Sequence, residues 1–158
     1  MKRLTISADA CTETLALLIM MAWADGRLDD KEKEGVRAAA SVFNLSKELR
    51  ERIDQLLEKP MPVEELLVEG MGPKDRAFAF VAAAWMAGVD DDVDPKEQDL
   101  LDKAAVLLGV NRDRKAELTQ IARDLPAKAE RAWSDEVVAL FRAIPQRLEG
   151  EDVEVAFE

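Results

Sequence analysis

The stretch Leu15 to Ala24, LALLIMMAWA, is almost unbroken apolar sequence and runs directly into an acidic corner, Asp25-Gly26-Arg27-Leu28-Asp29-Asp30-Lys31-Glu32. A constant offset of 65 residues (90 − 25 = 65) separates it from a second copy, in which Phe78 to Ala87, FAFVAAAWMA, leads through Gly88 and Val89 into Asp90-Asp91-Asp92-Val93-Asp94-Pro95-Lys96-Glu97. At this offset residues 12–57 align without a gap with residues 77–122. The sequence therefore predicts two copies of one helical unit.

Local signals divide each unit into helices. In the first unit we expect helices over about 7–24, 29–44 and 46–59, and one or two further turns within 63–68. Asp29 and Glu32 form a capping box, and Ser46 is a typical N-cap whose counterpart in the second unit is Asn111. The breaker cluster Gly70-Met71-Gly72-Pro73 marks the boundary between the units. A last helix, about 128–148, is expected to bend or end at Pro145.

These patterns predict an all-α fold: a compact bundle of about seven helices built from two pseudo-symmetric helical repeats, with no sheet. A chain of 158 residues has the size of one domain. We place that domain at residues 1–148, with repeat one at about 7–68 and repeat two at about 74–148. Residues 149–158 form an acidic C-terminal tail, for which disorder is one option.

The charge balance restricts the partners. A formal net charge of −11 argues against a nucleic-acid backbone as ligand, because such binding needs clustered Lys and Arg. We expect cations or a protein partner, either basic or membrane-associated, and self-association into a homo-oligomer is left open. The apolar runs are about ten residues long, half of what spans a bilayer, so we expect no membrane insertion and a cytoplasmic protein. The single cysteine, Cys11, is expected to be a small buried apolar residue.

The two acidic corners are the candidates for chemistry. Carboxylates that converge at a helix-turn-helix corner suit a hard cation, Ca²⁺ first and Mg²⁺ second, whereas Zn²⁺ and copper prefer nitrogen and sulfur ligands. Neither corner is an EF-hand, because the glycine position counted from Asp90 is Pro95 and the twelfth position is Leu101. The candidate metal ligands are Asp25, Asp29, Glu32, Asp90, Asp94 and Glu97.

A structural alternative explains most of the same acids. Asp29 and Asp94 can be N-caps and Glu32 and Glu97 can complete capping boxes, each worth roughly 0.5–2 kcal/mol. Capping does not explain Asp25 or its equivalent Asp90, because a negative charge at the end of a helix opposes its dipole. On physical grounds alone, capping is the stronger interpretation.

Catalysis is not expected. The chain has no histidine for general-base work, no serine or cysteine beside a base in the sequence, and no glycine-rich phosphate loop. We therefore expect a protein that is not an enzyme, with a divalent cation as its only cofactor.

The corners carry a family resemblance. The run Ala24-Asp25-Gly26-Arg27-Leu28-Asp29-Asp30-Lys31-Glu32 and its second copy from Val89 to Glu97 resemble the repeated pattern of the tellurite-resistance TerB-like family. The superfamily also includes the helical domain attached to some membrane-anchored J-domain co-chaperones. The similarity covers about residues 12–122. The second copy departs from the pattern in having Asp91 where the first has Gly26.

The resemblance implies a non-catalytic protein of tellurite resistance or stress response. It implies that divalent cations, calcium in particular, bind the acidic corners, and that the protein acts through protein partners. The alternative function is a purely structural, acidic interaction module without a metal site. Direct detoxification of tellurite is not expected, because a net charge of −11 repels an oxyanion and one cysteine supplies no dithiol.

Overall fold

A computed structural model describes residues 2–6, 8–24, 30–43, 45–59, 61–66, 68–69, 71–86, 95–125, 133–149 and 153–157. The helices are α1 (Ala8–Ala24), α2 (Asp30–Val42), α3 (Lys47–Glu58), the 3₁₀ helix η1 (Val63–Glu65), α4 (Pro73–Met86), α5 (Pro95–Leu107), α6 (Arg112–Asp124) and α7 (Trp133–Glu149). Two short strands, β1 (Lys2–Ile6) and β2 (Val153–Phe157), lie near the two ends of the chain. The predicted all-α bundle of seven helices is confirmed.

The internal repeat is visible in the element boundaries. The helix α4 begins 65 residues after α1 (73 − 8), and α6 begins 65 residues after α3 (112 − 47). The helix α5 starts and ends 65 residues after α2 (95 − 30 and 107 − 42). Both predicted caps are also present: Ser46 Oγ accepts a hydrogen bond from the Leu49 amide, and Asn111 Oδ1 accepts one from the Arg114 amide. The same local sequence signals therefore produce the same three-helix unit in both repeats, α1–α3 and α4–α6.

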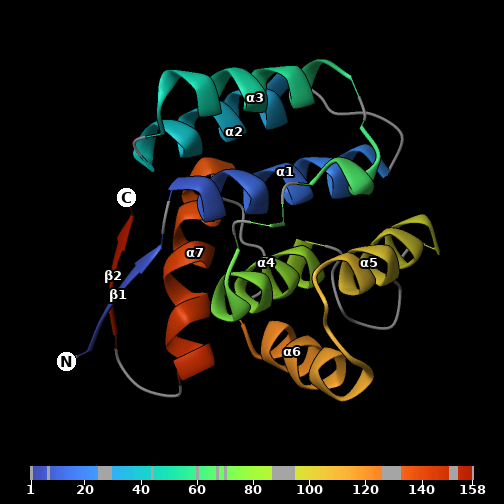
Figure 1. Ribbon diagram of the computed structural model, residues 1–158. Helices are drawn as coiled ribbons and strands as arrows, with labels where there is room; N and C mark the ends of the chain where they lie inside the picture. Colours follow the sequence, from blue (N-terminus) through green and yellow to red (C-terminus); the bar gives the residue numbers. More distant parts are fainter. Residues whose placement is uncertain are drawn as a thin grey trace.

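The helices α1 and α4 pack against each other at the centre of the bundle. In Figure 1, α2 and α3 lie on one side of α1, and α4, α5 and α6 lie on the other. Residues 15–21 of α1 and 77–85 of α4 are buried throughout, so these helices are covered on every face. Within the units, α3 packs on α1 and α6 packs on α4, which is the same pairing in both repeats.

Three polar side chains are buried in the first half of α1, and each has a partner. The hydroxyls of Thr12 and Thr14 donate to the carbonyl oxygens of Ala8 and Ala10, one turn earlier in the helix. The carboxylate of Glu13, of which only 5 % is exposed, faces a guanidinium instead. Burial of these groups is tolerated because a satisfied polar group avoids most of its desolvation cost.

The buried ion pair between Glu13 and Arg52 joins three elements. Arg52 Nε donates to Glu13 Oε2 at 2.9 Å, and Nη2 donates to Oε1 at 2.8 Å, which makes the contact bidentate. The same Nη2 also donates to the carbonyl oxygen of Glu65 at 3.1 Å. One guanidinium on α3 therefore holds both α1 and the end of η1.

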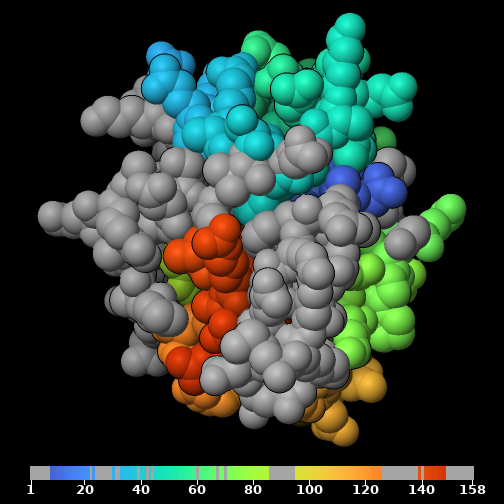
Figure 2. Space-filling view, turned by 90° about the vertical axis from the view of Figure 1, so that its left-hand side faces the viewer, coloured from blue at the N-terminus to red at the C-terminus, as the bar shows by residue number. Residues whose placement is uncertain are grey.

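The helix α7 closes the bundle, and its Phe141 contacts both three-helix units. Its ring stacks on Phe43 from repeat one, with centroids 4.8 Å apart, and meets Phe78 from repeat two edge-on at 5.0 Å. The helix α7 continues through the buried Pro145 to Glu149, close to the predicted end at about residue 148, so Pro145 does not end it. In Figure 2 the described part of α7 lies at the surface below α2 and α3.

No sheet was predicted, but the two ends of the chain form a two-stranded one. Strands β1 and β2 pair in parallel, with Leu4 opposite Val155 at the centre of the register, and β2 also contacts α7. The predicted acidic tail is therefore partly ordered, since Val153–Phe157 is a strand. Among the described helices, none combines the length and the apolar content that crossing a bilayer requires.

We predict that Arg52→Met lowers the free energy of unfolding by about 3 kcal/mol, because Glu13 stays buried without its guanidinium partner. The double variant Glu13→Leu with Arg52→Met is expected to recover most of this loss, since it removes both charges. Urea unfolding followed by far-ultraviolet circular dichroism measures both values.

The control is Arg37→Met, which removes an exposed ion pair between α2 and α3. Arg37 Nε lies 3.0 Å from Asp54 Oδ1, and about half of each side chain is exposed, so the expected loss is under about 1 kcal/mol. Equal losses for Arg52→Met and Arg37→Met would contradict a special role for the buried pair.

Candidate functional site

The structure describes the helices on either side of each acidic corner but not the corners themselves. The first corner follows the end of α1 at Ala24 and precedes α2, which begins at Asp30; the second lies between the end of α4 at Met86 and the start of α5 at Pro95. Of the six predicted ligands, Asp25, Asp29, Asp90 and Asp94 lie outside the described residues, and Glu32 is described only by its backbone. Their role as ligands therefore stays a prediction.

Glu97 is the predicted ligand whose side chain is described. It lies half-buried in the first turn of α5, where a carboxylate is favoured by the amide groups of the helix start. Within the described part of the chain, no group of three or more acidic or sulfur-bearing side chains is arranged to hold a metal ion. The corners, with five of the six candidate side chains, lie outside that part of the chain.

A pocket joins the end of α1 to the beginning of α5. Its volume is about 280 Å³, and it is lined by Met20, Trp23, Met61, Pro62, Val63, Glu64, Lys96, Asp99, Leu100 and Lys103. We call it the α1–α5 pocket. Trp23 stands two residues before Asp25 in the sequence, and Lys96 stands two residues after Asp94. The flanks of the two corners, far apart in the chain, thus line one cavity.

A hydrogen bond fixes the corner end of α1. The indole Nε1 of Trp23 donates to the carbonyl oxygen of Leu56 at 3.0 Å. That carbonyl lies in the last turn of α3, and its usual partner four residues on would be Pro60, which has no N–H. Trp23 therefore supplies a donor that the backbone cannot, and the bond is worth about 1 kcal/mol.

The residues of α5 in this pocket were not predicted from the sequence. Lys96, Asp99, Leu100 and Lys103 are spaced by three, four and seven positions, which places them along one face of a helix. That spacing was a usable signal in the sequence. Arg52 was missed because its partner Glu13 is 39 residues away.

Cys11 lies in the buried face of α1 and is fully enclosed. Burial, aided by the nearby charge of Asp75, raises the pKa of its thiol from the ordinary 9.0 to about 12. A thiol that stays protonated is a poor nucleophile and a poor metal ligand. The expectation of a small buried residue is confirmed.

A protein-family model described as "Protein of unknown function (DUF533)" matches residues 6–122, about three quarters of the chain. The chain belongs to the DUF533 family. The DUF533 region begins at the last residue of β1, contains the aligned stretches 12–57 and 77–122 with both corners, and ends inside α6. The helix α7 and strand β2 lie beyond it. No curated protein and no solved structure matches the chain.

The buried thiol of this DUF533 protein predicts a specific alkaline instability. Above pH 9 the unfolded chain releases the Cys11 proton while the folded chain keeps it until about pH 12, so stability falls with rising pH across this window. Between these limits the loss is about 1.4 kcal/mol per pH unit.

Urea unfolding at pH 8 and at pH 10.5 measures this effect in the wild type and in Cys11→Ala. Lysine titration affects both proteins alike, so the difference in slope belongs to the thiol. Equal pH dependence in the two proteins would show that the thiol titrates normally in the folded chain.

Proposed function

We propose that this protein is a non-enzymatic, TerB-like cation-binding protein that holds a divalent cation, Ca²⁺ before Mg²⁺, at each acidic corner. Asp25, Asp29 and Glu32 supply the ligands at the first corner, and Asp90, Asp94 and Glu97 supply them at the second. Oxygen ligands of this kind match the preference of Ca²⁺ for six to eight hard donors.

The observation that carries the proposal is the shared pocket between the flanks of the two corners. A cation that bridges the end of α1 and the start of α2 restrains Trp23, which already bonds to α3. A cation at the second corner restrains the start of α5, where Lys96 lines the same cavity. Binding at one corner is therefore coupled to the other through packed helices, which are stiff over such short distances.

The role we propose in tellurite resistance or stress response is indirect. The protein passes its cation-bound state to a protein partner, basic or membrane-associated, instead of acting on tellurite itself. The support is the net charge of −11, which repels oxyanions, and the enclosed thiol of Cys11, which is kept protonated.

A second candidate is an acidic interaction module in which the corner residues are helix caps. The observation in its favour is the pair Ser46 and Asn111, since this chain does use equivalent polar residues to cap equivalent helices. Under this alternative Asp29 and Asp94 do the same for α2 and α5, and the acidic surface docks a basic partner without any cation.

We predict that the chelator-stripped protein binds Ca²⁺ in a calorimetric titration, more tightly than it binds Mg²⁺ or Zn²⁺. Asp25→Asn and Asp90→Asn are each expected to abolish one binding event. At a free Ca²⁺ concentration of about 100 times the dissociation constant, each site adds about 2.7 kcal/mol to the free energy of unfolding.

The matched control is Asp113→Asn. Asp113 is an exposed acid in the first turn of α6, remote in sequence from both corners, and its removal should leave Ca²⁺ binding unchanged. Absence of binding at millimolar Ca²⁺, or equal loss in all three variants, would reject the cation sites and leave the capping module.

A further inference from the structure

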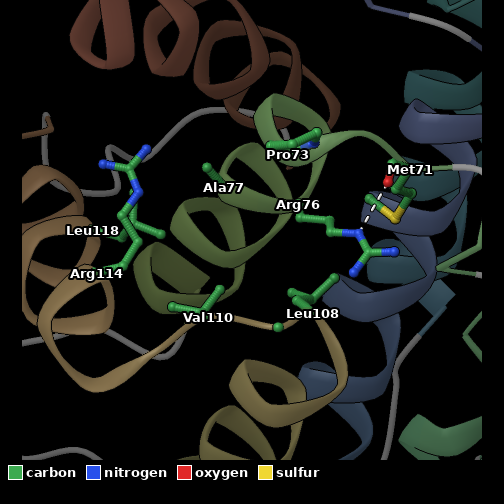
Figure 3. Close-up of a pocket in the computed structure, with 9 residues that line it drawn as sticks. Met71, Pro73, Arg76, Ala77, Leu108, Val110, Arg114 and Leu118 are labelled. Atoms are coloured by element: carbon green, nitrogen blue, oxygen red, sulfur yellow. Dashed lines mark hydrogen bonds between the residues drawn. The ribbon is translucent and has the colours of Figure 1, made fainter.

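A second cavity lies at the other end of α5, between α4, α6 and the turn after α5. Its volume is about 450 Å³, within the range of about 300–1,000 Å³ typical of small-molecule sites. Its walls are mainly apolar, and the side chains that matter for its chemistry are Arg76, Ala77, Leu108, Val110 and Arg114. Figure 3 shows the two arginines on opposite sides of the cavity with the apolar residues between them. We call it the repeat-two pocket.

Arg76 presents an unused donor group. Its Nε donates to the carbonyl oxygen of Met71 at 2.9 Å, and its Nη2 donates to that of Val68 at 3.0 Å, so the guanidinium is held in place by neutral acceptors. Among the described residues no carboxylate pairs with it, and Nη1 has no hydrogen-bond acceptor. The neighbouring Asp75 instead accepts from the Gly72 amide at 3.2 Å. A half-buried positive charge without a negative partner favours an anion.

The turn after α5 keeps this nitrogen accessible. The chain leaves α5 in a Schellman motif: the Gly109 amide donates to the Val106 carbonyl, the Val110 amide donates to the Ala105 carbonyl, and Gly109 has a φ of 71°. A side chain at this position would begin 3.5 Å from Arg76 Nη1. Glycine therefore leaves the space beside the guanidinium unfilled.

Repeat one has different side chains at the positions that line this cavity in repeat two. At the offset of 65, Arg76 replaces Cys11 and Arg114 replaces Leu49, while Leu108 replaces the larger Phe43. Cys11 and Phe43 are fully buried, and neither of them carries a positive charge. The change from Phe43 to Leu108 removes side-chain volume, and the two arginines place positive charge in the lining.

We propose that the repeat-two pocket binds a small organic anion with an apolar body and a carboxylate, the carboxylate on Arg76 Nη1 and the apolar body over Leu108 and Val110. Arg114 lies exposed at the opposite side, where its Nη1 already pairs with Glu117 at 2.5 Å, and it adds favourable charge at the rim. The chain as a whole carries −11, so this pocket is a local reversal of the surface charge and selects the anion by contact instead of by long-range attraction. The proposal does not depend on the cation sites.

Octanoate is the probe, and 1-octanol is the uncharged control of equal chain length. With ¹⁵N-labelled protein in chelator, octanoate is expected to shift the amide resonances of residues 108–110 and of Arg76 and Arg114, and octanol is expected to bind at least about tenfold more weakly. Equal binding of the two probes, shifts spread over unrelated helices, or no shift at millimolar octanoate would each overturn the proposal.

Three variants localise the site. Arg76→Gln and Val110→Glu should each weaken octanoate binding at least about tenfold, the first by removing the anchoring charge and the second by placing a competing carboxylate at the rim. Because Arg76 also holds two carbonyls and Arg76→Gln could disturb the fold, the half-exposed Val110→Glu keeps the test decisive. Arg112→Glu makes a charge reversal at the start of α6, two residues after Val110 but outside the pocket lining, and should leave binding unchanged; a loss equal to that of Val110→Glu would overturn the proposal.

Discussion

The fold depends on two helices whose central residues, 15–21 in α1 and 77–85 in α4, are apolar on every face. A helix with one polar face can lie at a surface, but α1 and α4 must be surrounded, and the remaining helices supply that cover. Both repeats contain such a helix, so each repeat must supply helices that cover it. This requirement also explains the buried hydroxyls of Thr12 and Thr14, whose hydrogen bonds close within α1, and the buried carboxylate of Glu13, whose charge is met by Arg52.

This arrangement gives the acidic corners a rigid base. Each corner follows a helix that is enclosed by its neighbours, and the end of α1 is tied to α3 through Trp23 and Leu56. Flanking helices that are already fixed by packing need no further ordering when an ion binds, which lowers the cost of binding. Pre-organisation of this kind is the physical basis of the function that we propose.

Much of the fold could be predicted from the sequence because its signals are local. Capping residues and apolar spacing act within one or two turns, and so the starts of α2, α3, α5 and α6 agree with the predicted repeat. Strands β1 and β2 could not be predicted in this way, because Lys2 pairs with Val153 across nearly the whole chain. The sequence could not decide whether Pro145 bends or ends its helix, because the effect of a proline depends on packing that only the tertiary structure supplies.

The candidate site was predicted to a smaller extent. The sequence identified the corners through repeated acids, but it could not show that Trp23 and Lys96 line one pocket, since that contact depends on how α1 meets α5. It also gave no sign of the repeat-two pocket, whose charge and volume arise from side chains on different helices. Arg76 and Arg114 become significant only when α4 and α6 are packed.

The most direct test of the central claim is a Ca²⁺ titration of the ¹⁵N-labelled protein followed by amide resonances. If cations bind at the corners, the resonances that flank both corners, including those of Trp23 and Glu97, shift together, while those of α6 stay in place. If no resonance moves at millimolar Ca²⁺, or if the shifts scatter over exposed acids in all helices, the corners are helix caps and the cation-binding account is wrong.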